Sequence, residues 1–456
     1  MPGLAPLRLS FLAIPLALGL LGCASPDART VVPWSKRFGD AGAQSVGGVA
    51  VFGDGTIALT GAFTRSIDFG GGALRSAGGD DVFVASLDSA GHASWSGRTG
   101  STGAQRGEAV AFAPNGDVLI AGTFTGLISF GGAELATNTP SSGFVARFDA
   151  TGHALWSRQI DGGSVSLHGL AVGPDGSAVV GGSFTHDASF ARIALATDGQ
   201  AAFLGKLDAN GAPVWAAVFT GSNHEVRGVA VDAAGGVVAV GDVSGSIGVG
   251  AKSGAADQQS PFVAAFDASG DARYLDVFNV TQGAAQANAV ALDAGGNALI
   301  AGQTYADITF GTSTVSVLGN GEEAFVARVS RDGAPQWMRP FGGDRAPRVT
   351  ATSIAVDAAD HAILTGAYQG DVDFGGGFIG ARTASAPFLV ELDGRGAHVT
   401  SRGFGVEGNV AEGSAIAVDP AGALVLAGTF SGSVALGGAP LVAAGDVAAF
   451  VGYLKR

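Results

Sequence analysis

One unit of about 60 residues recurs seven times along the chain, and this repetition limits the possible folds more than any other feature of the sequence. Each copy starts with a hydrophobic–alanine–hydrophobic run, such as VAV at Val49, and continues through a tight glycine turn into a second apolar run. A third and a fourth run complete the unit. The first run has alanine at its centre in every copy, at Ala50, Ala111, Ala171, Ala230, Ala291, Ala355 and Ala417.

Three other positions of the unit repeat almost as regularly. The second run ends on a glycine, at Gly61, Gly122, Gly182, Gly241, Gly302, Gly366 and Gly428. The third run begins with phenylalanine, at Phe83, Phe144, Phe203, Phe262, Phe325, Phe388 and Phe450. The fourth run carries an aromatic residue at Trp95, Trp156, Trp215, Tyr274 and Trp337, and the sixth copy has Thr400 there instead.

Four short runs of β-type composition per period, without a helical pattern, are typical of one blade of a β-propeller. The seventh copy stops at Arg456 after its third run, while an orphan fourth run, VVPWSKRFG, precedes the first copy from Val31 to Gly39. We expect this run to complete the last blade, so that no sheet edge is left open. The predicted fold is all-β, a single closed seven-bladed β-propeller over residues 31–456 with four antiparallel strands per blade.

The repeated residues have a packing explanation in such a fold. Blades converge toward the axis, so the innermost strand should accept only small side chains at its centre, which accounts for the alanines. The large aromatic residues belong on the outermost strand, where blades diverge and gaps must be filled. Tight turns should connect the first to the second and the third to the fourth strand on one face. The longer second-to-third connections and the links between blades should lie on the other face.

The complete unit resembles that of seven-bladed β-propeller repeat proteins found among secreted and lipoprotein chains of bacteria. The residues that carry the resemblance are the hydrophobic–alanine–hydrophobic run, the Asp/Pro-x-Gly turn, TGxF, FGG and FVAxLD…G…W, over essentially all of Val31 to Arg456. The unit also looks like kelch blades, and LDSAGHASW is similar to the repeat of quinoprotein propellers. The resemblance implies a fold and export from the cytoplasm, and it implies no reaction.

The N-terminal segment predicts export and a lipid anchor. Arg8 precedes an apolar run from Leu9 to Leu21 that is too short to span a bilayer comfortably, as in signal peptides. Leu20-Leu21-Gly22-Cys23 resembles the bacterial lipobox, which implies cleavage after residue 22 and acylation of Cys23. Residues 23–30 would form a lipidated tether, and Ala24 after the cysteine resembles the pattern of lipoproteins released to the outer membrane. The seven residues after Cys23 reach at most about 25 Å.

Composition and motifs exclude several kinds of function. The net charge of −14 and the lack of a Lys/Arg cluster argue against nucleic acid as a partner. The only cysteine, Cys23, is assigned to lipid and is not available as a nucleophile. No P-loop, GxSxG elbow or dense calcium loop is present, so we expect no cofactor and no metal, and we assign no catalytic residue.

The best candidate for a site is a ring of unlike residues at the entry of the innermost strands. Three residues before each central alanine lie Gly47, Glu108, His168, Arg227, Asn288, Thr352 and Ser414. Six of them are polar and all seven differ from one another, although the positions that follow them vary little between repeats. The sequence therefore predicts a binding site at the channel mouth, formed by Glu108, His168, Arg227, Asn288, Thr352 and Ser414. The alternative is that strand starts are simply polar and solvated.

The third repeat and the link after it hold several histidines that could share one rim. His168, the pair His186 and Asp187, and the pair His224 and Glu225 would allow a metal site or a histidine–carboxylate acid–base pair. Their spacing is not a compact ligand motif, and scattered surface histidines are the alternative. The remaining candidates, His92, His153 and His398, should lie near turns on the opposite face.

These observations favour a non-catalytic binding or scaffold module, held by its N-terminal lipid at the cell envelope, with the outer membrane as the expected location. Its partner would be a protein or a glycan. The alternative function is an exported hydrolase or lyase with Glu108, His168 and Arg227 at the channel mouth.

Overall fold

The computed structural model describes residues 32–40, 42–197, 199–317, 321–343, 348–407 and 410–456. The fold described below is that of the unit Val31–Arg456. Its described residues form antiparallel sheets and contain no helix, so the chain is all-β as expected. The described residues accordingly contain no helix that is long and apolar enough to cross a membrane. The signal segment and Cys23 lie outside the described residues.

Within the described residues, seven sheets have four principal strands each, and we number them one to seven in chain order. Sheet one consists of β2 (Gln44–Val51), β3 (Ile57–Phe63), β6 (Asp81–Leu87) and β7 (Ala93–Thr99). Sheet two consists of β8 (Gln105–Phe112), β9 (Val118–Phe124), β12 (Ser142–Phe148) and β13 (Ala154–Asp161). Sheet three consists of β14 (Ser164–Val172), β15 (Ala178–Thr185), β18 (Gln200–Leu207) and β19 (Pro213–Val218).

The remaining sheets follow the same plan. Sheet four consists of β21 (His224–Val231), β22 (Val237–Val249), β23 (Lys252–Phe266) and β24 (Ala272–Val277). Sheet five consists of β26 (Ala285–Leu292), β27 (Ala298–Thr304), β30 (Glu323–Val329) and β31 (Pro335–Phe341). Sheet six consists of β32 (Arg348–Val356), β33 (Ala362–Asp373), β34 (Phe378–Leu392) and β35 (His398–Gly403). Sheet seven consists of β37 (Ala411–Val418), β38 (Leu424–Phe430), β41 (Ala448–Leu454) and β1 (Trp34–Phe38).

The fourth strand of sheet seven comes from the beginning of the described chain. β1 pairs antiparallel with β41, with Trp34 opposite Tyr453 and Arg37 opposite Phe450. This confirms the pairing expected for the segment around Trp34.

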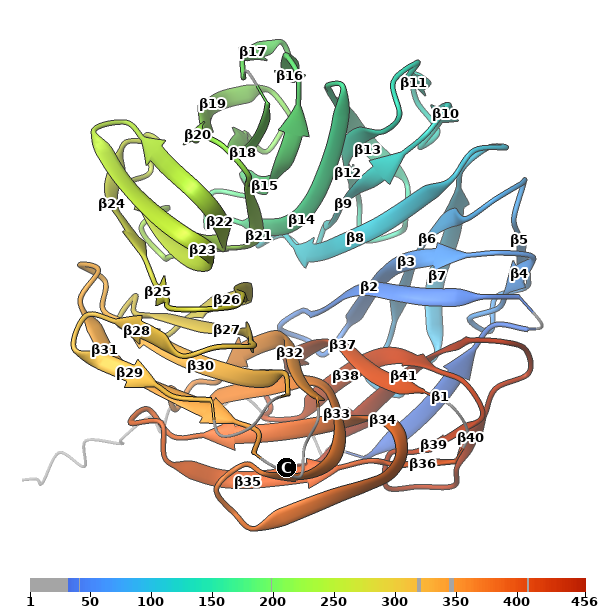
Figure 1. Cartoon of the computed structure of the whole chain (residues 1–456). Helices are drawn as coiled ribbons and strands as arrows, with labels where there is room; N and C mark the ends of the chain where they lie inside the picture. Colours follow the sequence, from blue (N-terminus) through green and yellow to red (C-terminus); the bar gives the residue numbers. More distant parts are fainter. Residues whose placement is uncertain (1–31, 41, 198, 318–320, 344–347, 408–409) are drawn as a thin grey trace, which may run out of the picture. The chain divides into compact units, whose positions relative to one another are not determined.

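Figure 1 shows the sheets of this unit arranged in chain order around a common centre, with the first strand of each sheet innermost. Each first strand contacts the first strand of the next sheet, and β2 also contacts β37. Such a radial arrangement of four-stranded antiparallel sheets is that of a β-propeller.

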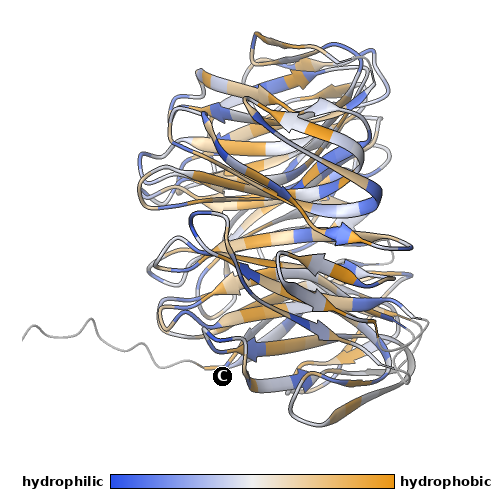
Figure 2. Cartoon of the chain, turned by 60° about the vertical axis from the view of Figure 1, so that its left-hand side comes forward, coloured by the Kyte–Doolittle hydropathy of each residue, from blue (hydrophilic) through white to orange (hydrophobic). Residues whose placement is uncertain are grey.

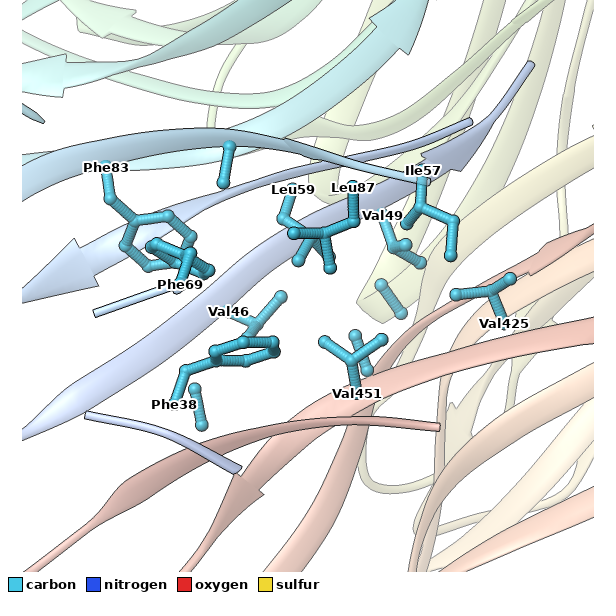
Figure 3. Packing of buried hydrophobic residues seen from close by; sticks show 14 of the residues in the cluster. Phe38, Val46, Val49, Ile57, Leu59, Phe69, Phe83, Leu87, Val425 and Val451 are labelled. Atoms are coloured by element: carbon cyan, nitrogen blue, oxygen red, sulfur yellow. The ribbon is translucent and has the colours of Figure 1, made fainter. Parts of the chain in front are cut away.

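The hydrophobic core lies between the sheets rather than in one central mass. Each of seven buried clusters combines residues of two successive sheets. In the cluster of Figure 3, Val46 and Phe83 of sheet one lie toward Val425 and Val451 of sheet seven, beside Phe38 of β1. Hydrophobic residues accordingly recur along the strands of successive sheets (Figure 2). The central alanines are half-buried, and Ala50 and Ala355 pack against such clusters, where space for a larger side chain is short.

The aromatic residue of each fourth strand covers a tight turn of the next sheet. The Trp95 ring lies 2.7 Å from where a Cβ of Gly152 would be, and its indole N–H donates to the Ala150 carbonyl at 3.0 Å. The same contact joins Trp34 to Gly91, Trp156 to Gly211, Trp215 to Gly270, Tyr274 to Gly333 and Trp337 to Gly396. The large residues of the outermost strands therefore do fill space between sheets, as expected.

Thr400 is the exception for a structural reason. Its position in sheet six would face a tight turn between the third and fourth strands of sheet seven. Those strands are β41 and β1, which lie at opposite ends of the described chain and are not joined by a turn. An aromatic residue at position 400 would have no turn to cover, and Thr400 is exposed.

The second-to-third connections start on the face of the inter-sheet links, as expected, but their tips do not stay there. Most form small hairpins: β4 (Ser66–Ile67) with β5 (Leu74–Arg75), β10 (Leu127–Ile128) with β11 (Leu135–Ala136), β16 (Ala188–Phe190) with β17 (Ile193–Leu195), β28 (Ile308–Phe310) with β29 (Ser313–Val315), and β39 (Ser433–Ala435) with β40 (Leu441–Val442). The short strands β20 (Thr220–Gly221), β25 (Asn279–Val280) and β36 (Gly405–Glu407) pair with these connections or with the extended β22.

The tips of these connections fold outward over the sheets toward the tight-turn end. The base of the third connection stays on the link face, since β16 pairs with Ile160 and Asp161 at the link end of β13. The tip of the sixth connection reaches further, since a Cβ at Gly375 would lie 2.9 Å from His398 at the start of β35. The cause is the phenylalanine of each FGG stretch, which packs on the third strand, with ring centroids 5.0 Å apart for Phe130 and Phe144. The expectation that these loops share a face with the inter-sheet links therefore holds for their bases, which pair with the links, whereas burial of this ring folds their tips outward over the sheet.

The substitution Trp34→Ala tests the contact between β1 and sheet one. It removes a ring that lies on Gly91 and beside Tyr453, and an N–H that donates to the Ser89 carbonyl at 2.8 Å. We expect the free energy of unfolding, measured by urea denaturation, to fall by about 3 kcal/mol. Thr400→Ala is the matched control and should change it by less than about 0.5 kcal/mol. Equal effects of the two substitutions would contradict this account of the joint.

Candidate functional site

The predicted ring residues share one backbone feature. In each first strand the pairing with the second strand shifts by one residue, between Val46 and Gly48 in sheet one and between Val226 and Gly228 in sheet four. The residue skipped by the shift is the extra residue of a β-bulge, which changes the direction of its side chain. The seven bulge residues are Gly47, Glu108, His168, Arg227, Asn288, Thr352 and Ser414.

The bulges explain the glycine that ends each second strand. Gly241 lies opposite Val226, and a Cβ on Gly241 would overlap the backbone carbonyl oxygen of Glu225. The corresponding glycine of every other sheet meets a first-strand carbonyl in the same way, at Gly61, Gly122, Gly182, Gly302, Gly366 and Gly428. The bulge therefore requires a residue without a side chain on the neighbouring strand.

The seven bulge residues line one cavity on the axis of the unit. Its volume is about 200 Å³, and the first strands of all seven sheets contribute to its wall. The structure therefore brings together all six residues named as the candidate binding site, with Gly47 completing the ring.

The charged part of the ring comes from sheets two to four. His168 Nε2 lies 2.8 Å from Glu225 Oε1. Arg227 pairs with the same Glu225 at 3.2 Å and with Asp242. Burial acts to raise the pKa of Glu225, but the hydrogen bond and charge of His168 and the charge of Arg227 bring the net pKa below its usual range.

The neutral part of the ring is used largely for contacts between sheets. The Asn288 side chain donates to the Ala351 carbonyl at 2.9 Å, and the Thr352 hydroxyl donates to the Gly413 carbonyl at 2.6 Å. Each of these residues thereby joins its own first strand to the next one. Asn288 and Thr352 are thus less available for a ligand than the sequence suggested.

Glu108 differs from the other charged residues of the ring. No hydrogen bond or ion pair joins its carboxylate to any residue that the structure describes, and Glu108 is half-buried. Burial raises the pKa of Glu108 above its usual range, and the charges of His168 and Arg106 offset this only in part. The cavity therefore contains a carboxylate that is partly desolvated and unpaired.

The histidines of the third repeat do not form one cluster. His168 and Glu225 make contact, whereas His224 is buried on the other side of β21 and its Nδ1 accepts the Ala202 N–H at 2.8 Å. Adjacent residues of a strand point to opposite faces, which separates His224 from Glu225. Burial lowers the pKa of His224. His186 lies beside Gly163, at the start of β14, and makes no contact with the axial cavity.

The structure also brings together three residues that sequence reasoning missed. Ligand atoms of Asp357, His361 and Glu391 lie within 4.8 Å of one another near the tight turn of sheet six. The Arg456 guanidinium lies 2.6 Å from Asp357 and 3.7 Å from Glu391. Burial acts to raise the pKa of Asp357, but the His361 backbone N–H and Arg456 bring the net pKa below its usual range. The only sequence signal was the four-residue spacing of Asp357 and His361 around the turn, because Glu391 belongs to another strand.

The three turn histidines are placed as expected. His92 and His153 lie beside Asp88 and Asp149 of their own turns and are exposed. His398 donates to or accepts from the Ser401 hydroxyl at 3.0 Å. It also lines a cavity of about 700 Å³ at the outer edge of sheets five and six, which the sequence did not indicate.

No protein-family model matches the chain, and no curated protein sequence is detectably similar to it. The solved structures to which it is similar include the WD40 repeats of RRP9, with 10% identity over 92% of this chain and 97% of that chain, and a TM-score of 0.49. BamB from Moraxella catarrhalis is 12% identical over 93% of this chain and 100% of that chain, with a TM-score of 0.40. The PL25 polysaccharide lyase, an ulvan lyase, is 11% identical over 86% of this chain and 93% of that chain, with a TM-score of 0.41. Because these identities and TM-scores are low, the description of the fold rests on the sheet topology of this chain itself.

The substitution Gly241→Ala tests the bulge. The added methyl group would force the Glu225 carbonyl and the Arg227 bulge to move, and we expect the free energy of unfolding to fall by about 1–3 kcal/mol or more. Chemical denaturation followed by circular dichroism measures this loss. Gly132→Ala is the control, since a Cβ there would meet no atom within 4 Å. An unchanged stability of the Gly241 variant would contradict the close approach of the two strands.

The substitution Glu108→Gln tests the desolvated carboxylate. Because the pKa of Glu108 is raised in the folded state, its charged form costs stability above that pKa, and the cost disappears as protonation proceeds at lower pH. We therefore expect the variant to have a higher Tm than the parent protein at pH 7.5, and the difference to vanish below about pH 4. Thermal denaturation at several pH values measures it. A lower Tm for the variant at pH 7.5 would show that Glu108 is stabilised by a partner.

Proposed function

We propose that the chain is a closed seven-bladed β-propeller that acts as a non-catalytic binding module at the bacterial cell envelope. In this proposal a lipid on Cys23 anchors it, and the axial cavity receives a cationic group of a protein or glycan partner. The observation that carries the proposal is the convergence of seven unlike bulge residues on one cavity that contains the unpaired carboxylate of Glu108.

Closure of the ring is supported by the joint between sheets seven and one. A buried cluster joins these two sheets as it joins every other successive pair, and β2 contacts β37. β1 covers the edge of β41, and a closed ring leaves no exposed edge to pair with another chain.

The size of the cavity indicates what can enter it. Sites for complete small-molecule ligands usually measure about 300–1,000 Å³, and the axial cavity has about 200 Å³. It is large enough for one side chain or one terminal sugar. This supports a macromolecular or oligosaccharide partner that inserts a protruding group.

The charges of the cavity favour a cation. Glu108 and Arg227 are the acidic and the basic lining residue, and Arg227 is already paired with Glu225 and Asp242, which leaves an excess of negative charge at the cavity. A lysine ammonium, an arginine guanidinium or the amine of an amino sugar would neutralise this excess and would donate hydrogen bonds to Glu108. An unpaired, partly desolvated carboxylate costs stability, and such costs are typical of functional sites.

The alternative function is a hydrolase or lyase that uses the same residues. The contact between His168 and Glu225 at 2.8 Å favours it, because a histidine oriented by a carboxylate can act as a general base. Arg227 would then stabilise negative charge, but its pairing with Glu225 and Asp242 already occupies its guanidinium.

Binding of defined probes to the purified protein and its variants tests the proposal. The probes are lysine-terminated peptides, chitosan oligosaccharides and N-acetylated oligosaccharides, with affinities measured by calorimetry. We expect a probe with a free amine to bind, and Glu108→Gln to weaken it by about 10–100-fold through loss of a charged hydrogen bond. Glu134→Gln, which changes an exposed glutamate that does not line the cavity, is the matched control and should bind as the parent protein does.

Two outcomes would count against the binding module. Equal affinities of the Glu108→Gln variant and the parent protein would exclude the axial carboxylate as the recognition group. Cleavage of an oligosaccharide that His168→Ala abolishes would assign the hydrolase or lyase function instead.

A further inference from the structure

A second cavity lies where β1 joins β41, and we call this place the seam. The cavity has a volume of about 290 Å³ and is lined by residues of β1, β35, β41 and the hairpin that contains Gly437 and Gly438. Added Cβ atoms at Gly437 and Gly438 would meet nothing within 4 Å, so the cavity is open at this hairpin.

The charged residues of the seam cavity are all basic. They are Arg402, Lys455 and Arg456, and all three are exposed. Arg456 is paired with Asp357, but Arg402 and Lys455 have no hydrogen bond or ion pair with any residue that the structure describes. The chain as a whole has 39 acidic and 25 basic residues, so a cavity lined by basic charges alone stands out against an acidic protein.

The seam is also the place where the chain leaves toward its N-terminus. Pro33 and Trp34 line the cavity, and Cys23 precedes Pro33 by ten residues. If Cys23 carries a lipid, covalent connection keeps the seam within about 35 Å of the membrane surface.

We propose that the seam docks on the anionic headgroups of phospholipids and thereby sets the orientation of the propeller on the membrane. This inference rests on the lipid anchor of the proposed function. The phosphate groups of such lipids would be bound by Arg402 and Lys455, with Arg456 at the edge of the same surface. Docking places the seam against the bilayer and leaves the opening of the axial cavity to the partner.

A contact of this kind is weak by itself, but it is sufficient to orient a protein that a lipid already holds at the membrane. Two basic residues near an anionic bilayer give a preference of roughly 30-fold for the docked orientation, which corresponds to about 2 kcal/mol. The tether makes docking intramolecular, so no separate affinity for the membrane is needed. The chain as a whole has a net charge of −14, so the same headgroups repel it outside this basic cavity.

The experiment measures the distance from two sites of the protein to the membrane. The lipidated protein is reconstituted into vesicles of phosphatidylcholine with or without phosphatidylglycerol, with an acceptor dye on the lipid. A donor dye is attached to Gly438→Cys at the seam or to Ser253→Cys in sheet four, which comes three sheets before sheet seven. The native thiol of Cys23 is blocked by its lipid, so each variant has one reactive cysteine.

We expect stronger energy transfer at position 438 than at position 253 in vesicles that contain phosphatidylglycerol, and loss of this difference at high salt. Arg402→Glu together with Lys455→Glu should abolish the difference without releasing the protein from the vesicles. Lys252→Glu together with Arg331→Glu changes the net charge equally at exposed positions elsewhere and should leave the difference intact.

The outcomes separate the docking proposal from the anchor. Cys23→Ser should remove the protein from the membrane fraction, and an unchanged membrane fraction would overturn the anchor itself. An anchored protein with equal energy transfer at the two positions would overturn seam docking and leave the anchor standing. Abolition of the difference by free inorganic phosphate at low ionic strength would assign the cavity to soluble phosphate rather than to a lipid surface.

Discussion

Hydrophobic contact between the faces of successive sheets is the interaction on which the rest of this structure depends. No sheet has a core of its own, because each buried cluster is shared by two neighbours. The stability of one sheet therefore requires the next one, and the last sheet requires the first. The tryptophans add to this at the periphery, each covering a turn of the following sheet. Thr400 departs from the pattern only where the following sheet has no such turn.

Crowding at the centre creates the candidate site. Seven first strands meet around one axis, and in each of them a bulge residue lines the cavity. The same bulge presses a carbonyl onto the neighbouring strand, which accepts only glycine there. The glycine recurs in every sheet because this close approach requires it, whereas the bulge residue lines the cavity and can differ from sheet to sheet. The ring of unlike residues is thus placed by the most regular part of the fold.

The ring is divided by what its members contact. Asn288 and Thr352 are engaged by the neighbouring strands, and Arg227 by two carboxylates. Glu108 is the member whose charge has no partner in the described structure, and its raised pKa records the cost of its partial burial. The unpaired charge lies on the side of the ring that sheets two to four form, so this side would be the recognition side of the proposed site. The seam lies at sheet seven, so the proposed partner and the proposed membrane surface would contact different sheets.

The sequence by itself determined the repeat, the four strands of each unit, the pairing of the Trp34 segment and the set of residues around the axis. It could do so because period, turn glycines and strand composition are local properties that recur seven times. Tertiary structure alone decided which ring residues stay unpaired, since the partners of His168, Asn288 and Thr352 come from the next sheet. It likewise decided the outward course of the hairpins, the grouping of Asp357, His361 and Glu391, and the basic seam. Each of these depends on contacts between segments that are far apart in the chain, which no local pattern encodes.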